Sequence, residues 1–241
     1  MGSKSRIAKY IVPILQKTIN DNNVTTFYDI CCGGCNIIDK VHAEKRIAVD
    51  SNPYLIALWK HIQVGLPLLD AVDRELYNNV KRELETDVYP DWIKGNVGFL
   101  ASYNGKFFDG GYAKPGIEKT KYGERKRDYY DEAKRNILKQ VELIQGIEFI
   151  CADYVSIEPK NAVIYCDPPY QRKTGYKNSK DFDYNKFWNI IRQWSKDNWV
   201  FVSEESAPDD MTCIWEQEVS RSLNPKNKTK ATEKLFIYEG E

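Results

Sequence analysis

The chain has 241 residues, and its 35 acidic and 35 basic side chains give a net charge of zero near neutral pH. Its hydrophobic content of 42% is enough for a packed core, and no apolar run approaches the ~20 residues that a membrane helix needs. These values argue against a membrane protein and against a uniformly basic nucleic-acid binder. We expect one cytoplasmic domain, or one domain with a sizeable insertion.

The first part of the chain alternates between helical and extended patterns. Pro13 predicts a kink inside the first helix, and Pro53 suits the first turn of a later one, because proline has no N–H to leave unpaired. The elements predicted from apolar spacing are a helix over 5–19, strands over 24–30 and 46–49, and helices over 53–64 and 69–84.

The middle of the chain has a different composition. Glycines alternate with aromatic residues over 86–126, which predicts loops and a hairpin. After it we expect a helix over 127–144, strands over 148–151 and 163–166, a helix over 184–196, a strand over 199–203, and a late antiparallel pair over 212–219 and 234–238. Strands that alternate with helices predict an α/β fold with a mostly parallel sheet covered on both faces.

The most specific motif is the turn Asp167-Pro168-Pro169-Tyr170, which follows an apolar strand. Neither proline has an N–H to give, so the strand must end there and the turn is stiff. Ligands of open α/β sheets bind at the carboxyl ends of strands. A carboxylate and a carbonyl at this place can accept both hydrogens of a planar amine while the ring stacks on its face. The alternative is an ordinary turn with a core tyrosine.

A second turn, over 29–36, is rich in small residues. Gly33 and Gly34 let the backbone pass close to a ligand. Asp50 ends the next strand, where an acid can accept hydrogen bonds from ribose hydroxyls, and Asp153 ends a third strand, where it can accept one from an adenine amine. The G-x-G-x-x-G pattern is absent, which favours a nucleoside over a dinucleotide. A plain tight turn and a turn-capping aspartate are the alternatives.

Three of the six cysteines, Cys31, Cys32 and Cys35, are close enough in sequence to suggest a metal site. The chain has two histidines and no second cysteine pair at zinc spacing. We therefore expect no metal and interpret these residues as buried thiols.

Taken in order, the glycine turn, the acids after the strands and the Asp-Pro-Pro-Tyr turn resemble the S-adenosylmethionine-dependent DNA adenine methyltransferases. More narrowly, they are similar to the DNA adenine methylase family in its alpha arrangement. The resemblance covers nearly the whole chain: the glycine turn belongs to a strand-and-glycine motif over 27–34, and three further segments, 2–4, 99–108 and 202–204, also match. The sequence departs from the family pattern at Asp29-Ile30-Cys31, where Glu-Pro-Phe is frequent, and at Cys35, where Gly is common.

The resemblance implies a Rossmann-like methyltransferase sheet formed by residues 1–68 and 127–241, with a target-recognition insert at 69–126. It implies transfer of a methyl group from S-adenosylmethionine to the exocyclic amine of an adenine flipped out of double-stranded DNA. The catalytic residues would be Asp167, Pro168, Pro169 and Tyr170. The cofactor-binding residues would be Lys4, Asp29, Cys31, Gly33, Gly34, Asp50, Asp153 and Asp167. The DNA-binding residues would be Tyr103, Lys106, Phe107, Lys114, Lys121, Arg125 and Arg127.

Three other interpretations remain. The aromatic residues of the insert can instead form a small core. The substrate can be an adenine in RNA, or a protein glutamine amide, although the amide enzymes usually carry Asn where this chain has Asp167. The protein can also be a nucleic-acid-binding relative that has lost catalysis. Local basic segments permit a phosphate-tracking surface, with nine basic against five acidic residues over 112–140 and five against one over 221–234.

Overall fold

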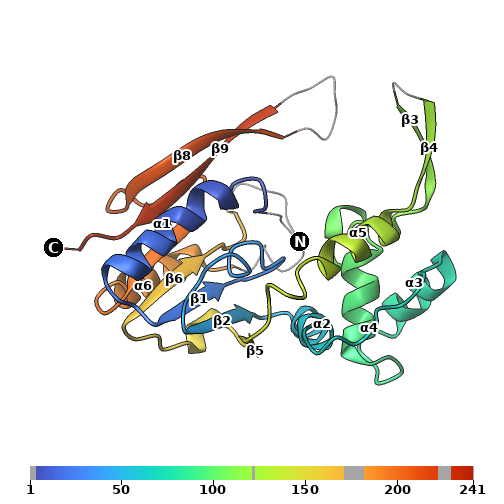
Figure 1. Cartoon of the computed structure of the whole chain (residues 1–241), viewed down its shortest axis with the longest axis horizontal. Helices are drawn as coiled ribbons and strands as arrows, with labels where there is room; N and C mark the ends of the chain where they lie inside the picture. Colours follow the sequence, from blue (N-terminus) through green and yellow to red (C-terminus); the bar gives the residue numbers. More distant parts are fainter. Residues whose placement is uncertain (1–3, 121–122, 171–181, 222–228, 241) are drawn as a thin grey trace.

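A computed structural model describes residues 4–120, 123–170, 182–221 and 229–240. Its main feature is a seven-stranded sheet with the strand order β5-β2-β1-β6-β7-β9-β8 (Figure 1). The strands are β1 (Thr26–Ile30), β2 (Lys45–Asp50), β5 (Ile147–Cys151), β6 (Ala162–Cys166), β7 (Trp199–Glu204), β8 (Thr212–Arg221) and β9 (Thr229–Ile237). The first five in this order pair in parallel, and β9 runs antiparallel to both β7 and β8. The predicted mostly parallel sheet and late antiparallel pair are confirmed.

Helices cover both faces of the sheet. Along β6 the buried side chains alternate: Val163 and Tyr165 join a core cluster with α1 and α2, whereas Ile164 joins a second cluster with α6. The helices are α1 (Ala8–Asp21), α2 (Pro53–Gln63) and α6 (Tyr184–Trp194). Because β6 is buried on both faces, its sequence is a continuous apolar run, which is typical of a central parallel strand.

Local sequence fixes where these helices begin. The Asn52 side chain accepts a hydrogen bond from the Leu55 N–H at 3.0 Å, and Pro53 occupies the first helical turn of α2. Asp183 caps α6 in the same way, by accepting from the Lys186 N–H at 2.9 Å. The start of α2 therefore matches its prediction, while α1 begins three residues later than predicted from apolar spacing.

A helical region lies beside the sheet and carries a hairpin that projects from it (Figure 1). Its elements are α3 (Arg74–Arg82), α4 (Asp91–Gly95), a π-helix (Asn96–Leu100), a short 3₁₀ turn (Tyr103–Gly105), the hairpin strands β3 (Gly116–Thr120) and β4 (Gly123–Arg127), and α5 (Tyr129–Leu138). A last 3₁₀ turn, Tyr154–Ser156, follows β5. Phe99 and Phe108 of this region belong to the same core cluster as α1 and the sheet, so the two parts share one core.

The expectation of loops over 91–100 is wrong, because this stretch is the buried α4 and π-helix. A Cβ on Gly95 would lie 2.1 Å from the Tyr54 carbonyl oxygen, and one on Gly98 would lie 2.4 Å from the Phe107 ring. These glycines permit close packing and do not form turns. The expected helices over 69–84 and 127–144 are also shorter, as α3 and α5. Among the described residues, no helix combines the length and the apolar character needed to cross a membrane.

Candidate functional site

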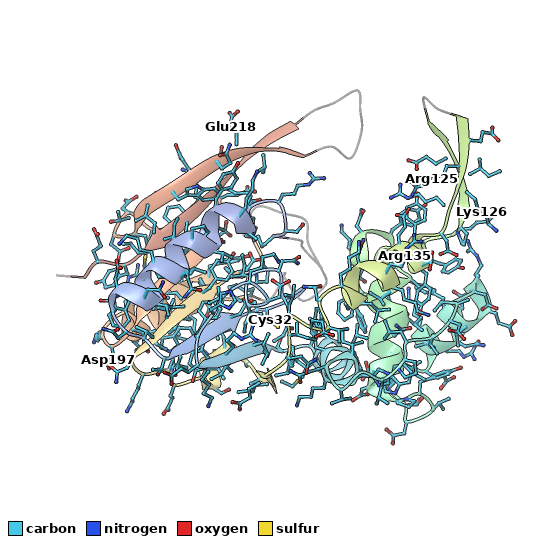
Figure 2. The ribbon with its side chains drawn as sticks, viewed as in Figure 1. Cys32, Arg125, Lys126, Arg135, Asp197 and Glu218 are labelled. Atoms are coloured by element: carbon cyan, nitrogen blue, oxygen red, sulfur yellow. The ribbon has the colours of Figure 1, made fainter. Side chains whose placement is uncertain are left out.

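A pocket lies at the carboxyl ends of β1 and β6, which are adjacent because the two strands pair in parallel with Ile30 opposite Cys166. The pocket is lined by Lys4, Asp29, Cys31, Cys32, Gly33, Gly34, Asn36, Ile37, Tyr165 and Asp167. Figure 2 shows Cys32 at this end of the sheet. The glycine turn and the aspartate of the Asp-Pro-Pro-Tyr turn are therefore brought to one pocket from positions more than 130 residues apart in sequence.

The glycine turn is held in an unusual backbone conformation. Cys31, Gly33 and Cys35 have φ values of 60°, 47° and 52°, and the left-handed region is costly for the two cysteines. Two hydrogen bonds offset this cost by fixing Gly33: its carbonyl accepts from Trp59 Nε1 at 2.9 Å, and its N–H donates to Asp50 Oδ2 at 3.2 Å. The turn is thus anchored from α2 and from the end of β2.

Two predicted acids lie at or beneath this turn. Asp50 accepts from Gly33 and, at 2.9 Å, from the Asn52 N–H, and it orders the turn without lining the pocket itself. Burial raises the pKa of Asp50, and its two backbone hydrogen bonds partly offset that rise. Asp29 is buried and accepts from the Ile38 N–H at 3.3 Å. Burial, reinforced by nearby carboxylates, raises the pKa of Asp29 well above its ordinary value.

Asp153 is not among the residues that line the pocket. Its exposed carboxylate accepts from the Val155 N–H at 3.0 Å and caps the 3₁₀ turn after β5. This is the turn-capping alternative stated for the sequence, and in these contacts Asp153 has no link to the glycine turn.

The Asp-Pro-Pro-Tyr turn continues from β6 and is fixed at both ends. The Asp167 N–H donates to the Ile30 carbonyl at 3.1 Å, which extends the β1–β6 ladder by one bond. The Pro169 carbonyl accepts from the Tyr184 hydroxyl at 2.7 Å. Pro168 is buried, and Tyr170 is 9% exposed. Asp167 thus faces the pocket from a rigid turn.

Four charged or polar side chains, Lys4, Asp167, Tyr170 and Glu233, form one connected cluster beside the pocket. The Lys4 ammonium lies 3.1 Å from Asp167 Oδ1 and 3.0 Å from Glu233 Oε2, and it also donates to the Tyr170 hydroxyl. The Tyr170 hydroxyl donates to Glu233 Oε2 at 2.5 Å. An ammonium has three N–H bonds, so Lys4 would have to exchange one of these partners to bind a cofactor carboxylate.

The charges of the cluster support one another. Burial alone would lower the pKa of Lys4, but the attraction of Asp167 and Glu233 outweighs it, and the pKa is raised. Burial, together with the same two carboxylates, raises the pKa of Tyr170 well above its ordinary value. The phenol is therefore held neutral and acts as a hydrogen-bond donor.

Glu233 was not identified from the sequence. It lies on β9, 63 residues after Tyr170, and belongs to no motif that could mark it. The one available signal is compositional, because Glu233 is the single acid in the otherwise basic stretch 221–234.

The predicted DNA-binding arginines are tied to α5. Arg125 donates to Glu132 at 2.7 Å, and Arg127 binds both carboxylate oxygens of the same residue at 3.2 and 3.0 Å. The Arg127 guanidinium also lies 4.5 Å from the centroid of the Tyr129 ring. Figure 2 shows Arg125 on the projecting hairpin, well away from Cys32. These contacts fix the hairpin to α5 and partly neutralise its basic charge.

The other predicted DNA-binding residues have different surroundings. Phe107 packs against Phe99 and Phe108 with ring centroids 4.8 Å apart in each pair, as the core alternative anticipates. Tyr103 is 43% exposed, Lys114 is exposed and Lys106 is half-buried. The remaining one, Lys121, lies outside the described residues.

The cysteines of the glycine turn are thiols in a buried setting. A hydrogen bond with Cys35 and burial together raise the pKa of Cys32 well above its ordinary value. Within the described ranges, no group of three or more His, Cys, Asp or Glu side chains could hold a metal ion.

Comparison with known proteins gives a family match over most of the chain. The family model for D12 class N6 adenine-specific DNA methyltransferases matches residues 1–90 and 110–212. The chain is 24% identical over 221 residues to the type II methyltransferase M.FokI of Planomicrobium okeanokoites, covering 80% of this chain and 31% of that protein. It is 28% identical over 152 residues to the retron Ec67 DNA adenine methylase of Escherichia coli, covering 57% and 52%. The chain thus spans about half or less of these relatives.

Among solved structures, the chain resembles the rRNA methyltransferase aviRa of Streptomyces viridochromogenes. The TM-score is 0.43 at 11% identity, with 97% of this chain and 84% of that chain covered.

Proposed function

Because the chain belongs to the D12 class of N6 adenine-specific DNA methyltransferases, we propose that it transfers a methyl group from S-adenosylmethionine to the exocyclic amine of adenine in double-stranded DNA. The observation that carries the proposal is that Asp167 and the glycine turn line the same pocket. The group that accepts hydrogen bonds from the amine and the turn that binds the nucleoside must lie side by side for such a transfer, since much of the rate gain comes from orientation.

The donor set of the pocket fits this cofactor. S-adenosylmethionine would supply a methyl group on a positively charged sulfur. Two carboxyl groups, Asp29 and Asp167, line the pocket, and an ionised carboxylate favours a cation beside it. Each carboxylate oxygen of Asp50 has one hydrogen bond and capacity for another, which suits ribose hydroxyls. We assign the holding of the cofactor to the backbone of Cys31, Gly33 and Gly34, to Asp50, and to Asp29 beneath them.

The Asp-Pro-Pro-Tyr turn would act on the adenine amine. The lone pair of this amine is conjugated with the adenine ring, which makes the amine a weak nucleophile. The Asp167 carboxylate and the Pro168 carbonyl would accept the two amine hydrogens and favour the tetrahedral geometry of attack, while the Tyr170 ring stacks on the base. The amine becomes acidic only after it gains the methyl group, so its proton can pass to water and Asp167 need not be a strong base.

Access to the amine requires the adenine to leave the duplex, at a cost of roughly a few kcal/mol. We propose that residues 69–126 recognise the target and that the β3–β4 hairpin contacts the DNA backbone. This proposal is supported by the hairpin itself, which projects from the body of the molecule and carries Arg125 and Lys126 (Figure 2). The exposed Tyr103 and Lys114 lie in the same region and would extend this contact.

The test is product analysis. The protein is incubated with S-adenosylmethionine and duplex DNA prepared from a host that lacks adenine methylation, and the DNA is digested to nucleosides for mass spectrometry. We expect N6-methyl-2′-deoxyadenosine. An identical reaction with transcribed RNA separates the RNA alternative: product in RNA and none in DNA would overturn the proposal. Calorimetric titration of the cofactor tests the inactive relative, for which no binding heat is expected.

A further inference from the structure

We propose that Glu233, on the C-terminal strand β9, is a positioning residue that holds Tyr170 and, through Lys4, Asp167 in the arrangement needed for methyl transfer; this rests on the proposed function. The carrying observation is that one oxygen, Glu233 Oε2, accepts from both the Tyr170 hydroxyl at 2.5 Å and the Lys4 ammonium at 3.0 Å. Glu233 thus connects both ends of the catalytic turn to a strand outside the motif.

The sheet explains why Glu233 reaches this position. On β9, Glu233 and Leu235 lie two residues apart and so point to the same face, and Leu235 is buried in the cluster that contains α1. Lys4 immediately precedes the first turns of α1. The side chain of Glu233 therefore meets the N-terminal segment above this face, beside the carboxyl end of β6.

The side chains of the cluster are largely shielded from solvent, which strengthens the hydrogen bonds between them. The exposed fractions of the Lys4, Asp167 and Glu233 side chains are 12%, 20% and 12%. Hydrogen bonds to a charged group in such surroundings are stronger than neutral ones and have stricter geometry. The hydrogen bond from the hydroxyl to Glu233 fixes the direction of the Tyr170 side-chain axis. Because a phenol O–H lies in the plane of its ring, the bond also favours one ring plane for the face proposed to stack on adenine.

The experiment compares Glu233→Gln and Glu233→Ala with wild type, using tritiated S-adenosylmethionine and adenine-unmethylated duplex DNA. Loss of a hydrogen bond to a charged group corresponds to about tenfold to hundredfold, and we expect kcat to fall by this factor in Glu233→Ala. The KM for S-adenosylmethionine should change by less than about threefold, because Glu233 does not line the pocket. The matched control is Glu216→Gln, an exposed carboxylate on the neighbouring strand β8.

A double-mutant cycle tests whether Glu233 acts through the tyrosine. We expect Glu233→Gln to reduce kcat less in a Tyr170→Phe background than in wild type, since the bond to Tyr170 is already lost there and only the contact of Glu233 with Lys4 remains to be weakened. Equal effects in the two backgrounds, or a kcat of Glu233→Ala within twofold of Glu216→Gln, would overturn the proposal.

The same double-mutant cycle, with Glu233→Gln, Tyr170→Phe and the double variant, is also measured on the Tm of thermal unfolding. Tm shifts of the two single variants that add up in the double variant would also overturn the proposal, because the Tyr170–Glu233 bond would then contribute nothing. A wild-type protein that folds but methylates no DNA would refute the proposed function, and the positioning role with it. Non-additive Tm shifts in that case would leave the Tyr170–Glu233 bond established as a structural contact.

Discussion

Replacing Lys4 with Met tests the charge cluster at the pocket, because it removes the cation that lies between Asp167 and Glu233. At 3.1 and 3.0 Å, each ion pair has a Coulomb energy of about 5 kcal/mol at an effective dielectric constant near 20. Desolvation offsets most of this gain, and removing one partner of a buried pair costs about 3–5 kcal/mol. The cluster is partly exposed, so we expect Lys4→Met to lower the free energy of unfolding by about 3 kcal/mol.

The assay is urea unfolding followed by circular dichroism, with Lys17→Met as the control. Lys17 forms an exposed ion pair with Asp21 in α1, and such a pair contributes less than about 0.5 kcal/mol. Folding raises the pKa of Lys4, so its contribution should be complete below the ordinary value of 10.5 and be lost as the pH rises above it. A loss from Lys4→Met no larger than that from Lys17→Met at pH 7.5 would refute the reasoning.

Three further predictions concern the surrounding fold. Gly95→Ala should lower the free energy of unfolding by about 2–4 kcal/mol, because the new Cβ would fall 2.1 Å from a backbone oxygen. Gly116→Ala, whose Cβ would meet nothing within 4 Å, should not lower it, and urea unfolding of both variants measures the difference. Burial raises the pKa of Tyr130 to about 12, so stability should fall by about 2–3 kcal/mol between pH 10 and 12, and Tyr130→Phe should lose less over the same range. Glu132→Gln should lower the free energy of unfolding by about 1 kcal/mol at pH 7. The hydrogen bonds from Arg127 lower the pKa of Glu132, so the difference in unfolding free energy between wild type and variant should vanish as the pH falls through that lowered pKa.

The parallel part of the sheet could be predicted from the sequence because its strands are short apolar runs that end at or just before an acid, the glycine turn or the Asp167 turn. The helical stretch over 91–100 could not be, because glycines among aromatic residues have the local pattern of loops. Gly95 is needed for contact with the backbone of α2, and a close contact of this kind depends on a neighbour more than 30 residues away, which local patterns do not reveal.

The site was predicted in part for a similar reason. Asp167 and the glycine turn have recognisable local motifs, and the parallel pairing of β1 and β6 brings them together. Glu233 has no motif, and its contact with Lys4 depends on the register in which β9 pairs with β7. Asp153 caps the turn after β5, and its predicted contact with the cofactor stays a prediction.

The most direct test of the central claim is methyl transfer by Asp167→Ala, measured as N6-methyl-2′-deoxyadenosine formed in duplex DNA. The control is Asp197→Ala, an exposed aspartate that Figure 2 shows at the other end of the sheet from Cys32. We predict that wild type and Asp197→Ala form the product at similar rates, and that Asp167→Ala forms it at least about 100-fold more slowly while remaining folded. Near-normal product formation by a folded Asp167→Ala protein would contradict the account.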